Sequence, residues 1–400
     1  MAILKPITTV TEEKEIKDLV CFSHLRWDFV YQRPQHLLSR FAKVFRVFYI
    51  EEAQFHDKED NCFVRQTSEN VWVVTPQLHE EEATELELIV RQKALLNRWF
   101  LKMEINNYMF WYYTPMALKI SDQFSPIRVI YDCMDELSAF KFAPTGLKEL
   151  EERLFEKSDL VFTGGHCLFE AKKNCHHNIH PFPSSIDKEH FEQAKLEIPD
   201  PADQAGIPHP RIGFYGVIDE RFNIKLMEQV AKKRPDWHFV LIGPVVKIDP
   251  ETLPRLENIH YLGGKSYHEL PTYLSGWDVT MIPFAKNEST KYISPTKTPE
   301  YLAAGKPVIS TSIRDVVIPY GEERLVHIAD TPSSFINAME RELSTKDKSD
   351  WEARVEKFLE NISWDKTWNK MMSLVEEILP ASRTQKATIR SMEPLAKASV

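Results

Sequence analysis

Apolar residues occur along this chain in short runs, and between the runs they recur at the spacing of an amphipathic helix. Runs of this kind in the first half predict buried strands at residues 18–23, 44–49, 71–75, 108–113, 128–132, 160–163 and 178–183. Strands that alternate with helical stretches, such as residues 80–106, are typical of a parallel α/β sheet. We therefore predict a doubly wound α/β domain in the first half.

Residues 187–210 interrupt this alternation. They hold Pro199, Pro201, Pro208 and Pro210 among charged residues, which is the composition of a linker. The alternation then restarts, with strands expected at residues 211–215, 238–242, 259–262, 279–282, 307–310 and 325–328. We predict two Rossmann-like domains, at residues 1–205 and 206–362. Ligands of such sheets bind beyond the carboxyl ends of the strands, so the cleft between the two domains is the expected site.

The two ends of the chain differ from these domains. Residues 333–380 are predicted to be helical, with Trp351, Trp364 and Trp368 as apolar anchors, and residues 381–400 to be a disordered tail. Residues 1–17 lack the apolar core of a signal peptide, and no stretch approaches the ~18–20 apolar residues that span a bilayer. We expect a cytoplasmic protein, and peripheral association with the inner face of a membrane stays open.

The amino-acid composition argues against several kinds of ligand and metal site. The 400 residues carry a formal net charge of −9, which argues against nucleic-acid binding because that needs a basic face. Five cysteines without CxxC spacing predict neither a disulfide framework nor structural zinc, and they fit a reducing compartment. His176, His177 and His180 lie near Cys175 without a carboxylate at ligand spacing, so no metal site is predicted.

The most informative segment is residues 292–311, which predict a loop, a short helix that ends at Gly305 and a buried strand. Free backbone amides at the helix start, near Ser294, Thr296 and Thr298, form an anion site, and Lys297 adds a positive charge. Glu300, one turn further, can accept two hydrogen bonds from a vicinal diol such as ribose. A nucleotide diphosphate presents both a phosphate and a diol.

A second segment, residues 211–225, points to the same ligand. The strand ends at Tyr215, and Gly216 lets the backbone approach a ligand closely. Arg221 can pair with a phosphate through two parallel hydrogen bonds. Lys225 is interpreted as a solvated helix residue rather than a second phosphate ligand.

The first half offers candidates for recognising a second substrate. The loop at residues 23–36 follows the first strand and is rich in polar and aromatic side chains, namely His24, Arg26, Trp27, Gln32 and Arg33. It can stack a sugar on an aromatic ring and bind an anion through an arginine, or it can pair its polar groups locally. Asp132 and Asp135 end another strand, where they either contact sugar hydroxyls or cap the following helix.

Residues 292–311 resemble the donor-binding motif of retaining GT-B glycosyltransferases of the family 4, or group 1, type. The resemblance implies two Rossmann-like domains that face each other across a cleft, a C-terminal helix at residues 363–380 that crosses back to the first domain, and a nucleotide-diphosphate sugar as donor. It implies that Glu300 grips the donor ribose, that Lys297 and Arg221 stabilise the leaving diphosphate, and that Gly263 abuts the donor base. It also implies retention of configuration with no metal or other cofactor.

One position departs from the family pattern. Tyr292 stands eight residues before Glu300, where the family carries a glutamate that contacts the donor sugar. The identity of the donor sugar and of the base is therefore left open. We predict catalytic roles for Arg221, Lys297, Asp132 and Asp135, and an acceptor that is a saccharide or a lipid-linked molecule. The family resemblance leads us to expect a role in the synthesis of a surface polysaccharide or glycoconjugate. A sugar-nucleotide epimerase and a non-catalytic nucleotide-sugar-binding protein remain alternatives.

Overall fold

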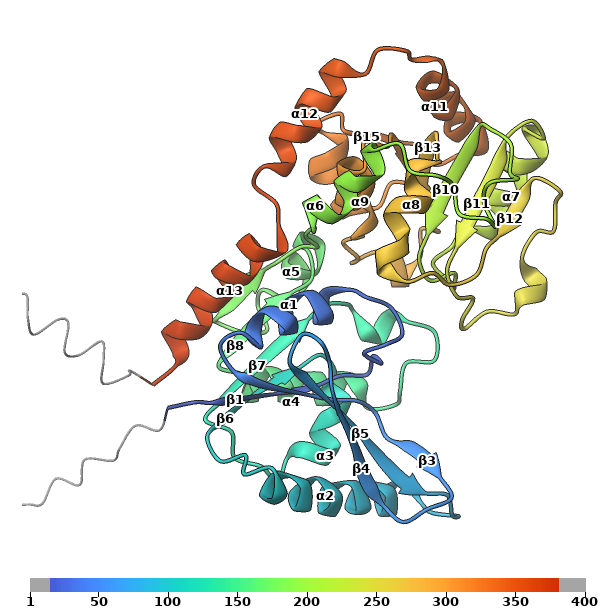
Figure 1. The fold of residues 1–400 in the computed structure, drawn as a ribbon. Coiled ribbons are helices and arrows are strands. Elements are labelled where there is room, and N and C mark those ends of the chain that lie inside the picture. Colours follow the sequence, from blue (N-terminus) through green and yellow to red (C-terminus); the bar gives the residue numbers. More distant parts are fainter. Residues whose placement is uncertain (1–14, 381–400) are drawn as a thin grey trace, which may run out of the picture.

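The computed structural model describes residues 15–380, and they form two sheets that belong to two lobes (Figure 1). The first sheet has the strand order β3-β5-β2-β1-β6-β7-β8-β9, with β4 antiparallel to β5. Its strands are β1 (Asp18–Phe22), β2 (Arg46–Ile50), β3 (Gln54–His56), β4 (Asn61–Gln66), β5 (Val71–His79), β6 (Tyr108–Tyr112), β7 (Arg128–Cys133), β8 (Leu160–Thr163) and β9 (Ile179–Pro181). Its helices are α1 (Arg33–Phe41), α2 (Glu85–Lys102), α3 (Leu118–Ser121), α4 (Leu147–Lys157) and α5 (His166–Lys172).

The second sheet is parallel throughout, with the order β12-β11-β10-β13-β14-β15. Its strands are β10 (Arg211–Tyr215), β11 (His238–Ile242), β12 (Ile259–Tyr261), β13 (Val279–Ile282), β14 (Val308–Ser310) and β15 (Val326–Ile328). The helices of this part of the chain are α6 (Lys188–Glu192), α7 (Ile224–Lys233), α8 (Leu270–Ser275), α9 (Lys297–Ala303), α10 (Arg314–Val316), α11 (Pro332–Ser344) and α12 (Ser349–Leu359).

The central strands are buried along their whole length, as in β1 and β6, and Asp18 at the start of β1 is the one charged residue of these two strands. Continuous apolar runs of this kind form where helices cover both faces of a parallel sheet. The predicted two doubly wound domains are thereby confirmed. The sequence pattern missed β3 and β4, because these edge strands are largely exposed and the segment that joins them, residues 57–60, is charged.

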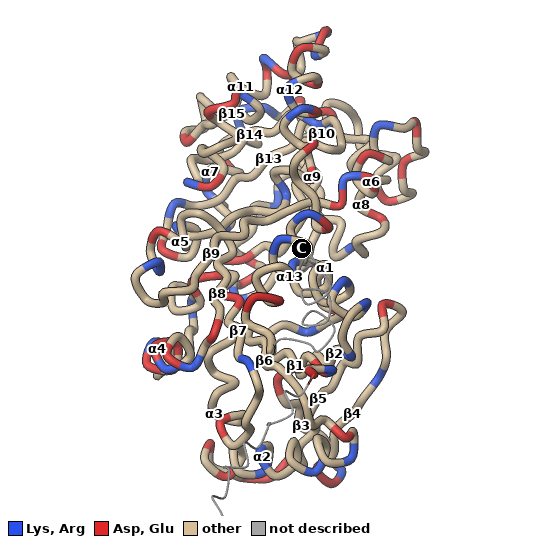
Figure 2. The backbone as a smooth tube through the Cα atoms, turned by 90° about the vertical axis from the view of Figure 1, so that its left-hand side faces the viewer, with Lys and Arg blue, Asp and Glu red and all other residues tan. Residues whose placement is uncertain are grey.

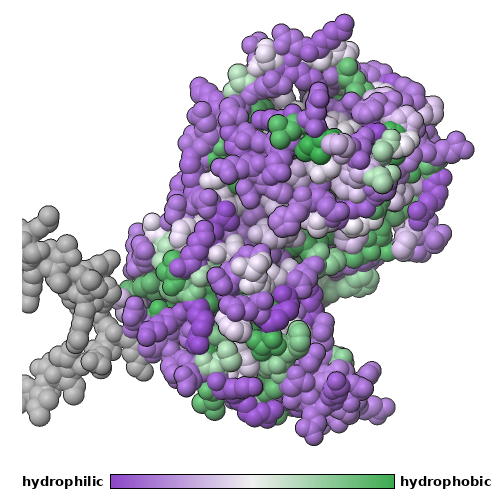
Figure 3. All heavy atoms as spheres, in the orientation of Figure 1, coloured by the Kyte–Doolittle hydropathy of each residue, from purple (hydrophilic) through white to green (hydrophobic). Residues whose placement is uncertain are grey.

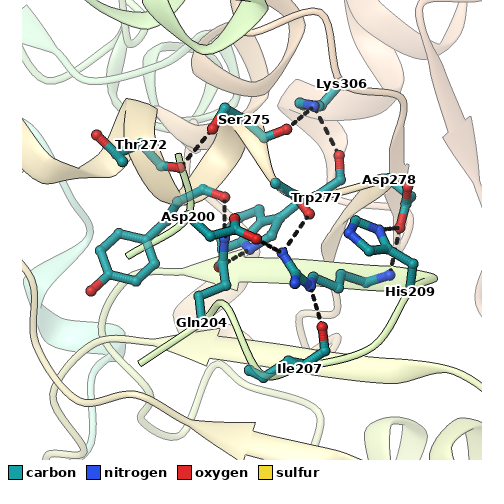
Figure 4. A network of polar contacts seen from close by, with 12 residues as sticks. Asp200, Gln204, Ile207, His209, Thr272, Ser275, Trp277, Asp278 and Lys306 are labelled. Atoms are coloured by element: carbon teal, nitrogen blue, oxygen red, sulfur yellow. Dashed lines mark hydrogen bonds and ion pairs between the residues drawn. The ribbon is translucent and has the colours of Figure 1, made fainter. Parts of the chain in front are cut away.

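The predicted linker belongs to the second domain, which corrects the boundary at residue 205. Ile186, Phe191 and Ala194 are buried in the core of the second sheet, so the change of domain lies near residue 186. Figure 4 shows how polar contacts fix the following residues: Asp200 pairs with the Arg211 guanidinium at 2.6 Å. Prolines and charges suggested a free linker, but the charges here pair with the second domain instead.

The last described helix, α13 (Trp364–Ile378), crosses back to the first domain (Figure 1). Its apolar residues Trp364, Met371 and Val375 are buried in the core of the first sheet. Arg40 of α1 pairs with Asp365 at 2.7 Å. The expected crossing helix is therefore present, while the predicted disordered tail at 381–400 lies outside the described residues.

Charged residues of both signs are interspersed over both lobes in the side view of Figure 2. Within residues 15–380, no helix combines the length and the apolar character that crossing a membrane requires. The same residues contain no cluster of three or more His, Cys, Asp or Glu side chains suited to hold a metal ion.

Candidate active site

Two glycines allow three parts of the second domain to meet at the carboxyl end of its sheet. Gly216 follows β10 and Gly243 follows β11, with φ of 133° and 138°, a backbone conformation that favours glycine. A Cβ atom on Gly243 would overlap the carbonyl oxygen of Gly216, and one on Gly216 would overlap the side chain of Lys297. The two strand ends and the lysine therefore form one surface.

Lys297, the first residue of α9, carries a positive charge without a counter-ion from the described residues. Its ammonium lies 5.7 Å from the ring centroids of both Phe214 and Phe284, and it makes no hydrogen bond or ion pair within residues 15–380. Burial and the nearby Arg221 lower the pKa of Lys297 to about 8. Because an unpaired buried charge is costly, this arrangement suits an anionic ligand.

Arg221 is fixed beside this lysine by Asp219. The Nε and Nη2 atoms of Arg221 donate hydrogen bonds of 2.9 Å and 2.7 Å to the Asp219 carboxylate, which is 2% exposed. Nη1 has no partner within the described residues. The guanidinium also lies 5.4 Å from the ring centroid of Phe140, which belongs to the first domain. Arg221 therefore stands at the interface of the two domains with donors left for a ligand.

Glu300 keeps one carboxylate oxygen free. The Tyr215 hydroxyl donates a hydrogen bond to Oε2, and Oε1 has no partner among the described residues. Burial raises the pKa of Glu300 to about 7, although Tyr215 and Lys297 act in the opposite direction. Oε1 is thus available to accept hydrogen bonds from a diol.

Two cavities lie between the domains, and Figure 3 shows the notch between the two lobes. One has a volume of 760 Å³, and we call it the glycine cavity; it is lined among others by Gly216, Gly243, Gly264, Tyr31 and Tyr267. The other has a volume of 490 Å³, and we call it the loop cavity; it is lined among others by His24, Arg26, Gln32, Asp135 and Arg221. The predicted candidates of the two domains therefore meet at the loop cavity.

Asp135 and His24 present unpaired polar groups to the loop cavity. Burial raises the pKa of Asp135 to about 6, and its carboxylate accepts no hydrogen bond within the described residues. Burial and then Lys247 lower the pKa of His24 to about 4, so its ring is neutral at pH 7. The His24 Nδ1 atom is buried without a partner. Both side chains can therefore bind hydroxyl groups of a second substrate.

Arg33 and Asp132 require a correction, because they pair with each other instead of facing the cleft. Arg33 donates from Nε and Nη2 to the Asp132 carboxylate at 2.8–3.1 Å, and from Nη1 to the carbonyl of Phe182 at 2.7 Å. Their side chains are 5% and 0% exposed. They hold the start of α1 against β7, and neither side chain lines the glycine cavity or the loop cavity.

Two other members of the predicted acceptor loop are held by the first domain. Trp27 is 7% exposed, packs edge-on against Tyr49 and lines the glycine cavity rather than the loop cavity. Arg26 lines the loop cavity, but it pairs with Glu51 at 3.0 Å. Trp27 is therefore not placed to stack a sugar at the loop cavity.

None of the predicted donor ligands of this segment, Lys297 and Glu300 included, lines the glycine cavity or the loop cavity. Ser294 contacts Ser184 across the domain boundary, with the Ser184 amide donating to the Ser294 hydroxyl at 3.3 Å. Thr298 is fully buried and its hydroxyl has no partner. Neither these two residues nor Thr296 lines either cavity, and Gly263 lies beside Gly264 at the strand end.

Tyr292 points away from the donor surface. Its ring packs against the core of the first domain, and it lines a separate surface cavity together with Glu136 and Lys172. Tyr292 lines neither the glycine cavity nor the loop cavity.

Sequence reasoning missed three aromatic or acidic residues of the site. Asp219 holds Arg221 from two positions earlier, a local signal that was available in the sequence. Tyr267 stacks on Tyr31 of the first domain, with ring centroids 4.6 Å apart, and its hydroxyl is buried without a partner. Phe140 contacts Arg221 from the other domain, which no local pattern indicates.

The two facing α/β domains, the crossing helix and the cleft define a protein of the GT-B fold. Solved structures agree: the sucrose-phosphate synthase of Thermosynechococcus elongatus matches with a TM-score of 0.67 at 15% identity, over 92% of this chain and 100% of that chain. A trehalose-6-phosphate structure from E. coli bound with UDP-2-fluoro glucose matches with a TM-score of 0.66 at 12% identity, over the same shares.

Residues 209–345 match the family model described as "Glycosyl transferases group 1". A curated relative, the "Putative teichuronic acid biosynthesis glycosyltransferase TuaH" of Bacillus subtilis (strain 168), is 28% identical over 279 residues, which is 65% of this chain and 68% of that protein. Residues 209–345 thus resemble the group 1 glycosyltransferases, and the chain is a glycosyltransferase of the GT-B fold. The predicted enzyme class is confirmed, and a nucleotide-sugar donor and a sugar acceptor follow from it.

The two shifted pKa values predict a bell-shaped pH dependence of kcat/KM for the donor, with its maximum between about pH 7 and 8. As pH rises through about 7, Glu300 ionises and becomes a better acceptor for the ribose diol. As pH rises further through about 8, Lys297 loses its charge and attracts the diphosphate less. Initial rates at subsaturating donor measure the profile.

Two variants test which residue causes the acidic limb and which causes the alkaline limb of this pH profile. Glu300→Gln should flatten the acidic limb, and Lys297→Arg should move the alkaline limb to higher pH, because a guanidinium stays charged. An acidic limb that persists in Glu300→Gln would contradict the assignment and point to Asp135, whose pKa is about 6.

Proposed function

We propose that this enzyme transfers a sugar from a nucleoside-diphosphate sugar to a hydroxyl group of a saccharide acceptor, with retention of configuration and without a metal or other cofactor. The observation that carries the proposal is the ammonium of Lys297, which has no partner among the described residues, beside the fixed guanidinium of Arg221 and one turn from the free oxygen of Glu300. Phosphate charge and a ribose diol match these groups.

In this reaction the bond from the anomeric carbon to the diphosphate breaks, a bond to the acceptor oxygen forms, and the proton of the acceptor hydroxyl passes to the leaving diphosphate. Lys297 and Arg221 stabilise the negative charge that develops on the leaving diphosphate, and because Asp219 holds Arg221 in place, little reorganisation is needed. Asp135 and His24 bind hydroxyl groups of the acceptor in the loop cavity. A cavity of 490 Å³ next to Arg221 favours transfer over epimerisation, which needs no acceptor.

We further propose a role in the synthesis of a surface polysaccharide on the cytoplasmic side of a membrane. The Bacillus subtilis relative carries teichuronic acid biosynthesis in its name, which supports the polysaccharide role. All five cysteines are free, which supports a reducing compartment.

A binding screen with one variant tests the donor proposal. Nucleotide sugars with different bases and sugars are titrated into the full chain by isothermal titration calorimetry. The best ligand should bind Glu300→Ala about 10- to 100-fold more weakly, because hydrogen bonds to a charged group contribute about 1.5–3 kcal/mol. Glu342→Ala is the matched control, since Glu342 is also a hydrogen-bonded carboxylate of the second domain but pairs with His327. Equal affinity in wild type and Glu300→Ala would contradict the proposal.

A further inference from the structure

α2 lies at the outer end of the first lobe, away from the second domain (Figure 1). One face of this helix is buried through Leu95, Leu96, Trp99 and Phe100. The opposite face of a surface helix is normally polar, because only the face towards the core has apolar neighbours. The outward face of α2 departs from this pattern.

Three large apolar side chains of α2 are directed to solvent. Leu86 is 70% exposed, Val90 is 58% exposed and Leu101 is 81% exposed. At about 100° per residue, these positions and the exposed Ala94 and Asn97 lie within about 80° of each other around the helix axis. They form one stripe opposite to the buried face, which we call the α2 stripe. An exposed apolar surface of this kind marks an interaction site.

The charges beside the α2 stripe are separated along the chain. The acidic residues of segment 80–87 are Glu80, Glu81, Glu82, Glu85 and Glu87, and the basic residues of segment 91–102 are Arg91, Lys93, Arg98 and Lys102. Neither segment contains a residue of the other sign. This order suits the dipole of the helix, but the dipole does not require apolar side chains on the outer face. A second copy of α2 in the opposite direction would place the basic half of one helix beside the acidic half of the other.

Ion pairs within the first domain account for part of these charges. Arg91 pairs with Asp60 and Glu81, Lys93 pairs with Asp122, and Glu85 pairs with Lys119. The side chains of Glu80, Glu82, Arg98 and Lys102 form no ion pair or hydrogen bond within residues 15–380. The unpaired charge is therefore negative before the start of α2 and positive near its end.

Two further acids lie near the basic end of α2. Arg98 lowers the pKa of Asp60, but Arg91 already forms an ion pair with that carboxylate. Glu104 follows α2 and raises the pKa of Arg46, with which it lines a separate surface cavity. Both acids are thus directed to other arginines, and Arg98 remains available to a second molecule.

Glu87 and Arg98 flank the α2 stripe on the same side, about 20° apart around the helix axis. Oε2 of Glu87 accepts a hydrogen bond from the Thr84 amide, and Oε1 has no partner among the described residues. A twofold axis perpendicular to the helix reverses its direction and leaves this flank on the same side of the interface. Glu87 of each copy then lies beside Arg98 of the other, and Leu86 lies beside Leu101.

We propose that two copies of this chain associate through their α2 stripes as an antiparallel dimer with twofold symmetry. In such an interface every contact occurs twice, so the match of Glu87 with Arg98 and of Leu86 with Leu101 is used on both sides. Because α2 lies away from the second domain, the glycine cavity and the loop cavity stay open in both copies (Figure 1). The dimer requires none of the residues assigned to sugar transfer.

Sedimentation equilibrium of the full chain at increasing protein concentration tests the proposal. The mass should rise from 46.7 kDa towards twice that value. A pair of single helices buries less surface than the ~1,600 Å² of a standard interface, so a dissociation constant of about 1–100 μM is expected. A mass that stays at 46.7 kDa up to about 500 μM, well above that range, would overturn the proposal.

Serine variants locate the interface. Leu86→Ser and Leu101→Ser should each raise the dissociation constant of the dimer by about tenfold or more, because each removes two apolar contacts from a twofold interface. Leu196→Ser is the matched control, since it removes a 65% exposed leucine of the second domain, and it should change the constant by less than about twofold. Equal effects of Leu86→Ser and Leu196→Ser would contradict the assignment to α2.

Charge reversal tests the antiparallel arrangement. Arg98→Glu should weaken the dimer by about tenfold, because it places a carboxylate beside Glu87 of the second copy. Adding Glu87→Arg to the same chain should restore the dissociation constant to within about threefold of wild type. Within one chain these residues lie about 16 Å apart along the helix, so they do not pair with each other. Absence of this rescue would overturn the antiparallel arrangement.

Lys233→Glu is the control for the charge change, since Lys233 is an exposed lysine at the end of α7, and it should leave the dimer intact. Two other results would assign the α2 stripe to a different partner and overturn the proposal. One is a monomer that Leu101→Ser destabilises, because the stripe is then covered within the chain. The other is a monomer that co-sediments with vesicles of phosphatidylglycerol and loses this binding in Leu86→Ser.

Discussion

Replacement of Lys297 by alanine is expected to lower the kcat of sugar transfer by about 100- to 1,000-fold, the usual effect of removing one preorganised electrostatic group. The ammonium has no partner among the described residues and stands beside Arg221, and in the proposed reaction these two cations face the negative charge of the leaving diphosphate. Because this charge grows during the reaction, kcat should fall more than the affinity for the donor. Steady-state kinetics with saturating acceptor measures both quantities.

Lys306 offers a matched control for this variant. It lies nine positions further along the chain, and burial lowers its pKa to about 8 as well, but its ammonium donates to the carbonyls of Ser275 and Trp277 at 3.0 Å and 2.8 Å (Figure 4). Lys306→Ala should reduce thermal stability and leave kcat per folded molecule nearly unchanged. A Lys297→Ala variant that keeps kcat within threefold of wild type would refute the role of Lys297 in charge stabilisation.

The part of the site that the sequence predicted is the part that local structure determines. Lys297 and Glu300 lie within one turn of one helix, so a single segment fixes their separation and their common direction. Gly216 and Arg221 likewise follow one strand end within six residues. Patterns of this length can be read without knowledge of the neighbouring elements.

The remaining contacts depend on distant segments that a linear pattern does not bring together. Arg33 and Asp132 are 99 positions apart, and either could have faced a ligand until the structure showed them paired. Phe140 and Arg221 meet only because the two domains face each other. Tyr292 has a direction that depends on how its loop packs against the first domain.

The same distinction holds for the fold. Strands such as β1 and β6 were predictable because burial on both faces requires a continuous apolar run. The segment before β10 was misassigned as a linker because its Asp200 and Asp203 have the composition of exposed residues, while their partners, Arg211 and Lys265, lie elsewhere along the chain. The composition of this segment predicts that Asp200 and Asp203 are exposed to solvent, whereas their ion pairs hold them against the second domain.

Asp132→Ala is expected to destabilise the protein by about 3–5 kcal/mol, because it leaves the Arg33 guanidinium buried without its counter-charge. Both side chains are almost inaccessible, and three hydrogen bonds join them. Denaturant unfolding, followed by tryptophan fluorescence, measures the loss. The variant should also lower activity, because Gln32, directly before α1, and Asp135, two residues after β7, border the loop cavity. This loss should be no larger than the change in the folded fraction and in the geometry of that cavity.

A double variant separates this structural role from a chemical one. Arg33→Met with Asp132→Leu replaces the pair by apolar side chains and should recover much of the stability that Asp132→Ala loses, because the desolvation penalty of both charges disappears. If the recovered protein also transfers sugar at a rate near wild type, Asp132 is a positioning residue. The exposed pair Arg234 and Asp236 is the comparison, since Asp236→Ala should cost no more than about 1 kcal/mol. An Asp132→Ala variant that is as stable as wild type but inactive would instead restore Asp132 as a group that contacts the substrate.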